Sequence, residues 1–372
     1  MKYLVISLAG IGDTLFATPL IHELRANFPD AVIDALVLWP GSRDVLEGNP
    51  HVNSVYQKNL LTASWVEALS FLCGLRAHRY DVSFNTHPQS RRHYRLAARI
   101  VGAATRISHD YDHGGFLDRW LVNRMMPQDY SRHSIENNLA LLGVLDVKPK
   151  LPRHEYEIFL SQDEENWATD FVAKQNLRSR RLLGVHVGSG GTKNLALRRW
   201  PLKHYVELFR KLNQERPDVS ILLLGGPEER AAHELILREV RSPLVLQPAT
   251  RSLRQAGAVL KRCEAFLSVD TSLMHIAAAV AVPTQIVIET PTFNKTIEPF
   301  GRAYRLVTNP AVAGRNLDYY RYDGGGIRGT RDEILRCMAS VKVDAVYRVL
   351  ESALPPPAAT AQGKDKNSPF GA

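Results

Sequence analysis

The sequence predicts an α/β protein built from two doubly wound, Rossmann-like domains that face a central cleft. Short apolar runs alternate with amphipathic segments through the 372 residues, which is typical of parallel strands joined by helices. This series pauses around Pro149 and Pro152 and then starts again. A chain of this length exceeds one ordinary domain. We therefore expect a first domain over residues 1–160 and a second over residues 161–335.

The first domain opens with a βαβ pattern, in which we expect a strand at residues 3–8, a turn at 10–13, a helix at 14–28 and a strand at 32–38. Gly10 and Gly12 match the first two glycines of a dinucleotide-binding fingerprint, but Leu15 occupies the position of the third. Asp13 also places a negative charge where a dinucleotide phosphate would lie. The pattern therefore disfavours a nicotinamide oxidoreductase.

A basic run follows the next predicted strand, at residues 81–85, and contains Arg91, Arg92 and Arg95. Such a run is usually a solvated helix face. Its functional alternative is contact with an anionic acceptor or an anionic membrane surface. A segment with helical spacing at residues 133–142 then closes the first domain.

The composition limits the classes of binding partner and the cellular compartment that we expect. The net charge of +9 suits acidic partners such as nucleotide sugars, anionic lipid surfaces or nucleic acid. Nucleic acid is disfavoured because the basic residues are scattered and no RNP-like or helix-turn-helix signature is present. Cys73, Cys263 and Cys337 lie far apart without metal-binding spacing, which favours a reducing, cytoplasmic compartment. No apolar run is long enough to span a membrane, and no signal-peptide cleavage pattern follows the first strand.

The second domain begins with a predicted strand at residues 182–187 and a glycine-rich turn at 188–193. Glycines let backbone amides approach a phosphate closely, while Ser189 and Lys193 add a hydroxyl and a positive charge. The turn is not a Walker A loop, because Asn194 follows Lys193. Arg198 can bind a diphosphate, or can be surface charge beside the Trp-Pro pair that precedes a helix at residues 202–212.

Two further strand ends carry polar side chains. After residues 220–224, Gly226 and Glu229 open a helix, and a carboxylate there can accept ribose hydroxyls or simply complement the helix dipole. After residues 265–268 come Asp270, Thr271, Ser272 and His275. Asp270 can accept from sugar hydroxyls, and the next two residues can bind phosphate or cap a helix.

In their order and spacing these motifs resemble glycosyltransferase family 9, the ADP-heptose:lipopolysaccharide heptosyltransferases and their relatives. The resemblance runs from residue 3 to about residue 350. It rests on residues 10–14, 186–190, 198–201, 225–230, 270–275, 291–292 and 299–301.

The resemblance implies a GT-B fold, in which the first domain binds the acceptor and the second binds the nucleotide sugar. It implies inverting transfer without a metal or cofactor, from ADP-heptose to a lipopolysaccharide core, a lipid-linked acceptor or a related glycan. Asp13 matches the general base, with helix capping as its alternative role. A helix within residues 336–354 is expected to return to the first domain. Residues 355–372 have the composition of a disordered tail.

The donor-binding residues implied by the resemblance are Ser189, Lys193, Arg198, Gly226, Glu229, Asp270, Thr271, Ser272 and His275. His275 has a packed histidine as its alternative reading. Three features depart from the family pattern: Arg198 replaces the usual Lys, Ser272 the usual Gly, and residues 289–294 the common Phe-Gly-Pro-Thr-Asp-Pro. Another nucleotide sugar, a protein acceptor or a non-catalytic relative therefore stays open. Residues 309–331 form either a mobile loop over the cleft or a surface excursion. We expect weak association with the inner face of an anionic membrane.

Overall fold

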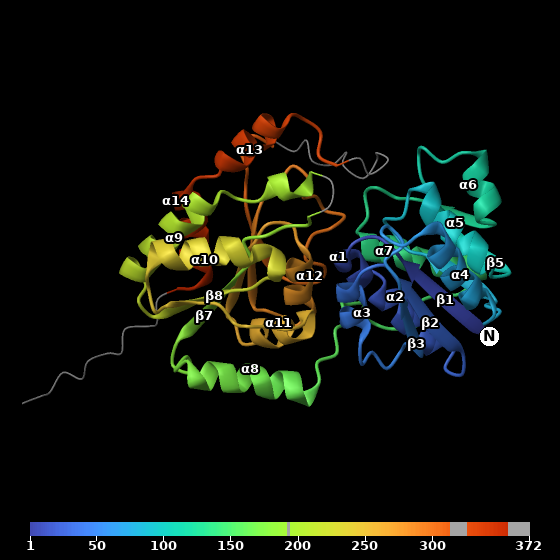
Figure 1. Ribbon diagram of the computed structural model, residues 1–372, viewed down its shortest axis with the longest axis horizontal. Helices are drawn as coiled ribbons and strands as arrows, with labels where there is room; N and C mark the ends of the chain where they lie inside the picture. Colours follow the sequence, from blue (N-terminus) through green and yellow to red (C-terminus); the bar gives the residue numbers. More distant parts are fainter. Residues whose placement is uncertain (192–193, 313–325, 356–372) are drawn as a thin grey trace, which may run out of the picture.

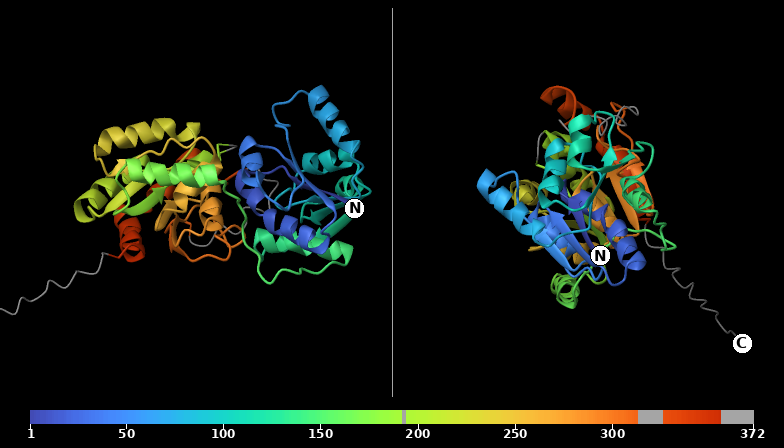
Figure 2. Two further views of the ribbon diagram at one scale, coloured as in Figure 1. Left: turned by 90° about the horizontal axis from the view of Figure 1, so that it is seen from below. Right: turned by 90° about the vertical axis from the view of Figure 1, so that its right-hand side faces the viewer.

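The computed structural model describes residues 1–191, 194–312 and 326–355. It contains two parallel six-stranded sheets, each flanked by helices, which lie side by side and are joined by the segment after residue 145 (Figures 1 and 2). The fold class predicted from the sequence is therefore confirmed. Lys193, residues 313–325 of the predicted loop and residues 356–372 of the predicted tail lie outside the described residues.

The first sheet has the strand order β3-β2-β1-β4-β5-β6, and every neighbouring pair is parallel. Its elements are β1 (Lys2–Ser7), α1 (Ile11–Leu15), α2 (Thr18–Asn27), β2 (Val32–Val37), α3 (Pro40–Leu46), β3 (Ser54–Gln57), α4 (Trp65–Arg76), β4 (Val82–Asn85), α5 (Arg92–Val101), β5 (Thr105–Asp110), α6 (Phe116–Leu121), β6 (Arg124–Pro127), α7 (Ser134–Ala140) and the 3-10 helix η1 (Leu141–Leu145).

The second sheet has the order β12-β11-β10-β7-β8-β9, which is the same arrangement read from the other edge. In each sheet the strand order therefore reverses beside the first strand, between β1 and β4 and between β7 and β10. The elements are α8 (Gln162–Lys174), β7 (Arg181–Val185), η2 (Leu195–Arg198), α9 (Leu202–Glu215), β8 (Val219–Leu223), η3 (Pro227–Glu229), α10 (Arg230–Val240), β9 (Val245–Leu246), α11 (Leu253–Leu260), β10 (Ala265–Ser268), α12 (Ser272–Ala279), β11 (Thr284–Ile288), β12 (Tyr304–Val307), α13 (Arg331–Ala339) and α14 (Val343–Ala353).

The first predicted helix differs from the observed one. The strands expected at both ends of it are confirmed, but α1 begins at Ile11 and stops at Leu15, and a separate helix α2 begins at Thr18. Pro19 lies in the first turn of α2, where its missing N–H costs nothing, but it could not continue the hydrogen bonding of α1. As a result, Asp13 lies in the first turn of a helix rather than in a turn before it.

The last helix, α14, does not return to the first domain, so that expectation is wrong. It packs against α9, β11 and β12 (Figure 1). Its Val346, Tyr347 and Leu350 are buried in the core of the second domain. The apolar side of α14 is therefore covered by the second domain itself rather than by the first.

The segment between the domains is held to α2 by a buried carboxylate. Glu23 has no exposed surface, and it accepts hydrogen bonds from the amides of Lys150 and Leu151, both at 2.8 Å, and from His154 Nε2 at 2.8 Å. Burial alone would raise the pKa of Glu23, but these hydrogen bonds outweigh it and the pKa is lowered.

We expect Glu23→Gln to destabilise the protein by about 1–3 kcal/mol at neutral pH, because an amide cannot accept all these donors. The folded-state pKa of Glu23 is lowered, so its stabilising contribution is present above the unfolded pKa and lost as pH falls through the folded value. The deficit should therefore shrink in acid. Urea unfolding across this range measures it, with the exposed Glu239→Gln as control. A constant deficit at every pH would contradict the role of the charge.

Candidate functional site

A cleft of about 1170 Å³ lies between the two domains. Its first wall is formed mainly by the loops that follow β1, β2 and β4, and its second wall mainly by the loops that follow β7, β8, β9 and β10. In each domain the cleft therefore meets the carboxyl edge of the sheet at the place where strand order reverses. Open α/β sheets bind ligands at this position because the loops on either side run in opposite directions and leave a crevice.

Asp13 lines the first wall of the cleft. Its carboxylate accepts a hydrogen bond of 2.6 Å from the amide of Gly10 and so caps α1. Burial and the negative charge of Asp13 raise the pKa of Tyr94, which lines the same wall. The capping role that the sequence allowed is thus present, and the same carboxylate faces the space where a ligand would lie.

Gln89 fixes the loop that carries Asp13, and sequence reasoning missed it. Its side-chain oxygen accepts from the amide of Leu8 at 3.1 Å, while its amide nitrogen donates to the carbonyl of Thr86 at 2.8 Å. Gln89 is buried and so ties the loop after β1 to the loop after β4. A single Gln in a polar run carries no sequence signal of this kind.

Gly12 allows the two domains to approach each other. An ideal Cβ at this position would lie 2.7 Å from Cδ2 of His275 in α12. His275 packs edge-on against Phe16 with ring centroids 4.8 Å apart, and its Nδ1 lies 3.2 Å from the hydroxyl of Tyr156. Burial, together with the charge of Arg198, lowers the pKa of His275 to about 3. His275 is therefore a neutral, packed residue at the domain interface, beside the cleft that it also lines.

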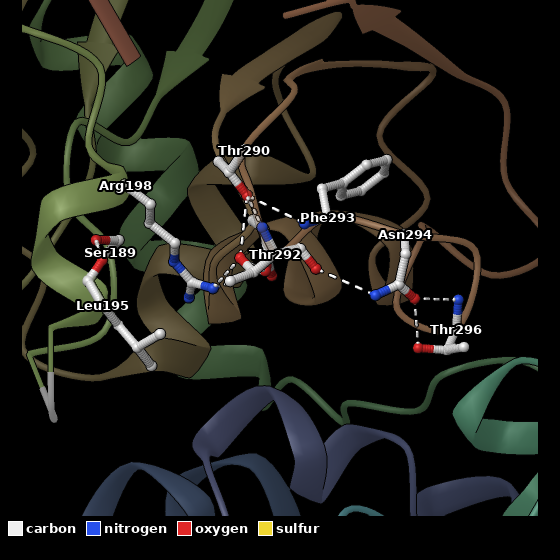
Figure 3. Close-up of polar contacts among 9 residues, drawn as sticks. Ser189, Leu195, Arg198, Thr290, Thr292, Phe293, Asn294 and Thr296 are labelled. Atoms are coloured by element: carbon white, nitrogen blue, oxygen red, sulfur yellow. Dashed lines mark hydrogen bonds and ion pairs between the residues drawn. The ribbon is translucent and has the colours of Figure 1, made fainter. Parts of the chain in front are cut away.

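Arg198 and Asp270 form a buried ion pair on the second wall. Arg198 Nη1 lies 2.7 Å from Asp270 Oδ2 and donates to Thr292 Oγ1 at 2.9 Å (Figure 3). Thr292 in turn donates to Asp270 at 3.2 Å. Within the described residues, the buried Nε of Arg198 has no hydrogen-bond partner. The guanidinium is thus held firmly by Asp270 and Thr292, on a residue that also lines the cleft.

Glu229 lies at the end of η3 and accepts from the amide of Gly226 at 2.9 Å. Its carboxylate also lies 3.8 Å from His186 and 3.6 Å from Arg199. Burial opposes ionisation, but these neighbours outweigh it and lower the pKa of Glu229. An ideal Cβ at Gly188 would lie 2.2 Å from Glu229 Oε1. The first glycine of the predicted phosphate turn is therefore required to make room for this carboxylate.

The remaining predicted donor residues lie around the same wall. Ser189 donates to the carbonyl of Leu195 at 3.0 Å (Figure 3). Thr271 caps α12 by accepting from the amide of Leu273 at 3.1 Å, so the capping alternative is correct for this residue. Ser272 begins α12 and lines the cleft, as Gly226 does after β8. The structure thus brings together eight of the nine predicted donor residues, and the ninth, Lys193, lies outside the described residues.

The sequence profile of glycosyltransferase family 9 (heptosyltransferase) matches residues 69–319. The chain belongs to this family. It is 26% identical over 330 residues to lipopolysaccharide heptosyltransferase 3 of Escherichia coli, covering 83% of this chain and 91% of that protein. It is 27% identical over 327 residues to lipopolysaccharide heptosyltransferase 2 of Salmonella typhimurium, covering 83% and 89%. The chain is therefore a glycosyltransferase.

Solved family 9 structures share the fold. The ADP-heptose lps heptosyltransferase II of E. coli aligns with a TM-score of 0.70 at 21% identity, covering 95% of this chain and 98% of that one. The fold is therefore GT-B, as the resemblance implied.

Two departures from the usual family 9 pattern contact each other. Arg198 takes the place of the usual Lys, and its hydrogen-bond partner Thr292 belongs to the atypical segment at residues 289–294. Thr290 and Thr292 also share a 3.0 Å hydrogen bond (Figure 3). Residues 289–294 therefore help to hold the guanidinium of Arg198. This contact indicates that the two departures from the family pattern are structurally linked.

The three arginines of the basic run in the first domain lie in three different environments. Arg91 lines the cleft. Arg92 is largely exposed and lies 3.6 Å from Asp118. Arg95 is fully buried, pairs with Asp118 and donates to the carbonyl of His109 at 2.9 Å. The prediction that Arg95 contacts an acceptor or a membrane is therefore wrong, because its charge is used inside the domain to hold α5 against α6.

Proposed function

We propose that this glycosyltransferase transfers heptose from ADP-heptose to a lipopolysaccharide core or a related lipid-linked glycan. The observation that carries the proposal is the placement of Asp13 and the ion-paired Arg198 on opposite walls of one cleft. The names of the relatives support heptose as the sugar and lipopolysaccharide as the acceptor. The solved heptosyltransferase II is named for ADP-heptose, which supports that nucleotide sugar as the donor.

The reaction is a single displacement that inverts the anomeric carbon. An acceptor hydroxyl approaches from the first domain, and Asp13 takes its proton as the oxygen attacks the anomeric carbon. The bond from that carbon to the β-phosphate oxygen breaks, and ADP departs with the electron pair. Arg198 and the first turn of α12 offset the charge that develops on the diphosphate. Anomeric configuration of the product, read by NMR, distinguishes inversion from retention.

The transfer needs no metal ion in this proposal. Both acidic side chains assigned to the donor wall already have protein partners, since Asp270 pairs with Arg198 and Glu229 lies near His186 and Arg199. In the part of the chain that the structure describes, no group of three potential metal ligands lines the cleft. Turnover should therefore persist in excess chelator.

The direct test incubates the purified protein with ADP-heptose and a heptose-deficient lipopolysaccharide core and looks for the mass of one added heptose. UDP- and GDP-sugars replace ADP-heptose in parallel reactions. Transfer from one of these instead would identify a family 9 enzyme with another donor. Transfer only to a polypeptide would identify a protein glycosylator, and binding of every donor without transfer would identify a non-catalytic relative.

We expect Glu229→Ala to weaken ADP binding by about 1–3 kcal/mol, because the ribose hydroxyls lose a charged acceptor. Titration calorimetry with ADP measures the loss. Glu228→Ala is the matched control, because this neighbouring carboxylate also lines the cleft. Equal losses in both variants would remove the ribose assignment.

Asp270→Asn should weaken binding of the full nucleotide sugar more than binding of ADP, since Asp270 is assigned to the sugar.

The protein is proposed to act on the cytoplasmic side of the inner membrane, where it would meet a lipid-anchored acceptor. Its basic charge of +9 suits an anionic leaflet. None of the helices that the structure describes has the length and apolar character needed to cross a bilayer.

A further inference from the structure

The first domain exposes an unusual concentration of large apolar side chains. Among the described residues, eleven large apolar side chains are exposed, and eight of them lie between residues 61 and 120. Trp65 is 86% exposed, Phe116 is 82% exposed and Trp120 is 57% exposed. Scattered single apolar residues on a surface are ordinary, but a cluster that includes two tryptophans marks a contact surface. We call this surface the apolar rim and define it as Trp65, Val66, Leu69, Phe116, Leu117 and Trp120.

The apolar rim is built from the starts of two short helices. In α4 the residues of the rim stand at the first, second and fifth positions, as they do in α6. An acidic residue at the third position of each helix caps it, since Glu67 accepts from the amide of Ser64 at 2.9 Å and Asp118 from that of Gly115 at 2.9 Å. The cap holds the first turn of each helix in place, and the apolar side chains of that turn face outward rather than toward the core.

Helix α5 holds the two helices on one flank of the domain. Both α4 and α6 pack against it, and all three lie on the side away from the second domain (Figure 1). Arg95 binds α6 through Asp118, and the guanidinium of Arg99 stacks 4.9 Å from the ring centroid of Trp120. Leu61, just before α4, is 60% exposed and also lines the cleft. Leu61 therefore links the start of α4 to the mouth of the site.

The same stretch of chain is strongly basic. Residues 58–124 contain ten Lys and Arg against five Asp and Glu, which is a net +5 out of the +9 of the whole protein. Arg76, Arg92, Arg119 and Arg124 are exposed on it. Tryptophan and arginine together are typical of protein segments that lie at a lipid headgroup layer, where the ring is partly buried and the cation meets phosphate.

We propose that the apolar rim and its arginines form a docking surface for an anionic phospholipid bilayer, with the side chains of the rim inserted at headgroup depth. A second copy of the chain is a poorer occupant, because two such surfaces would bring like charges together. The proposal deepens the proposed function, since a bilayer on this flank would present a lipid-anchored acceptor at the cleft mouth. In this proposal the membrane contact is centred on the starts of α4 and α6, and Arg92 is the residue that it shares with the basic run at residues 91–95.

Vesicle flotation tests the surface directly. The full chain is mixed with vesicles of phosphatidylcholine alone or with added phosphatidylglycerol, at low and physiological salt. We expect retention only with the anionic vesicles, and less of it at higher salt. The triple variant Trp65→Ser, Phe116→Ser and Trp120→Ser should lower the partition coefficient by about tenfold or more. Leu335→Ser, an exposed apolar residue of α13 in the second domain, should leave it unchanged.

Two further measurements separate the outcomes. ADP binding and transfer to a delipidated core oligosaccharide should be unchanged in the triple variant, so that a failed transfer reaction and a failed docking surface are distinguished. Equal retention of wild type and triple variant, or no retention on anionic vesicles, would overturn the proposal. So would a wild-type dimer in sedimentation that the triple variant abolishes, because the rim would then be covered by a second copy.

Discussion

Asp13→Asn is expected to lower turnover by about 10²- to 10⁴-fold while ADP affinity hardly changes. Asn keeps the size of the side chain and one oxygen that can accept from Gly10, so α1 keeps its cap. What the variant loses is the basic oxygen that would remove the acceptor proton. Initial rates at saturating ADP-heptose, together with calorimetric titration of ADP, measure the two effects separately.

Asp44 provides the matched control for this experiment. It also lines the first wall of the cleft, and its carboxylate accepts from the amide of Leu253 at 2.7 Å across the domain interface. Asp44→Asn likewise removes a negative charge from the cleft while keeping an acceptor. If both variants slow the reaction equally, the effect is general electrostatics and Asp13 is not the base. Loss of ADP binding in Asp13→Asn would instead assign Asp13 to the donor site.

Arg198→Met is expected to lower turnover by about 10²- to 10³-fold, because the departing diphosphate loses its preorganised cation. It should also destabilise the protein by about 3–5 kcal/mol, since Asp270 is left buried without its partner. Arg198→Lys, which restores the usual family residue, should recover much of the turnover. Rates are measured with ADP-heptose and stability by urea unfolding.

A double variant separates the two roles of Arg198. Arg198→Met with Asp270→Asn removes both charges, so most of the stability should return while turnover stays low. Turnover is compared with that of Asp270→Asn alone, because Asp270 is itself assigned to the donor sugar. If the double variant turns over as fast as Asp270→Asn alone, Arg198 is a structural partner of Asp270 and does not act on the diphosphate. Thr292→Val offers a milder probe, because it removes one hydrogen bond to the guanidinium and leaves the ion pair in place.

The sequence predicted the sheets and the position of the cleft well. Buried parallel strands are short apolar runs, and these leave a clear pattern at residues 3–8 and 265–268, where β1 and β10 are found. Polar turns after such strands predicted which side chains meet. The break after α1 was harder to predict from the sequence, because an apolar stripe continues from α1 into α2. Only Pro19 marks the start of the second helix.

Other features depended on contacts between segments distant in the chain. Gly12 and Gly188 looked like phosphate-loop glycines, yet each makes room for a particular side chain, His275 and Glu229. Arg95 looked exposed because its neighbours are charged, whereas Asp118 neutralises it inside the domain. Such pairings join residues whose separation in sequence carries no periodic signal, so only the folded structure identifies them.

The placement of α14 on the second domain has a consequence for how the protein is made. Each sheet is formed by one continuous stretch of chain, β1 to β6 and then β7 to β12, and the last helix stays with the later stretch. The whole first sheet therefore leaves the ribosome before any strand of the second has been synthesised. Phe16 and Ile135 of this first half share an apolar cluster with residues of α12, so they stay exposed to water until α12 has been synthesised. The time needed to translate the chain from residue 146 through α12 thus sets how long this nascent half stays uncovered and open to chaperones.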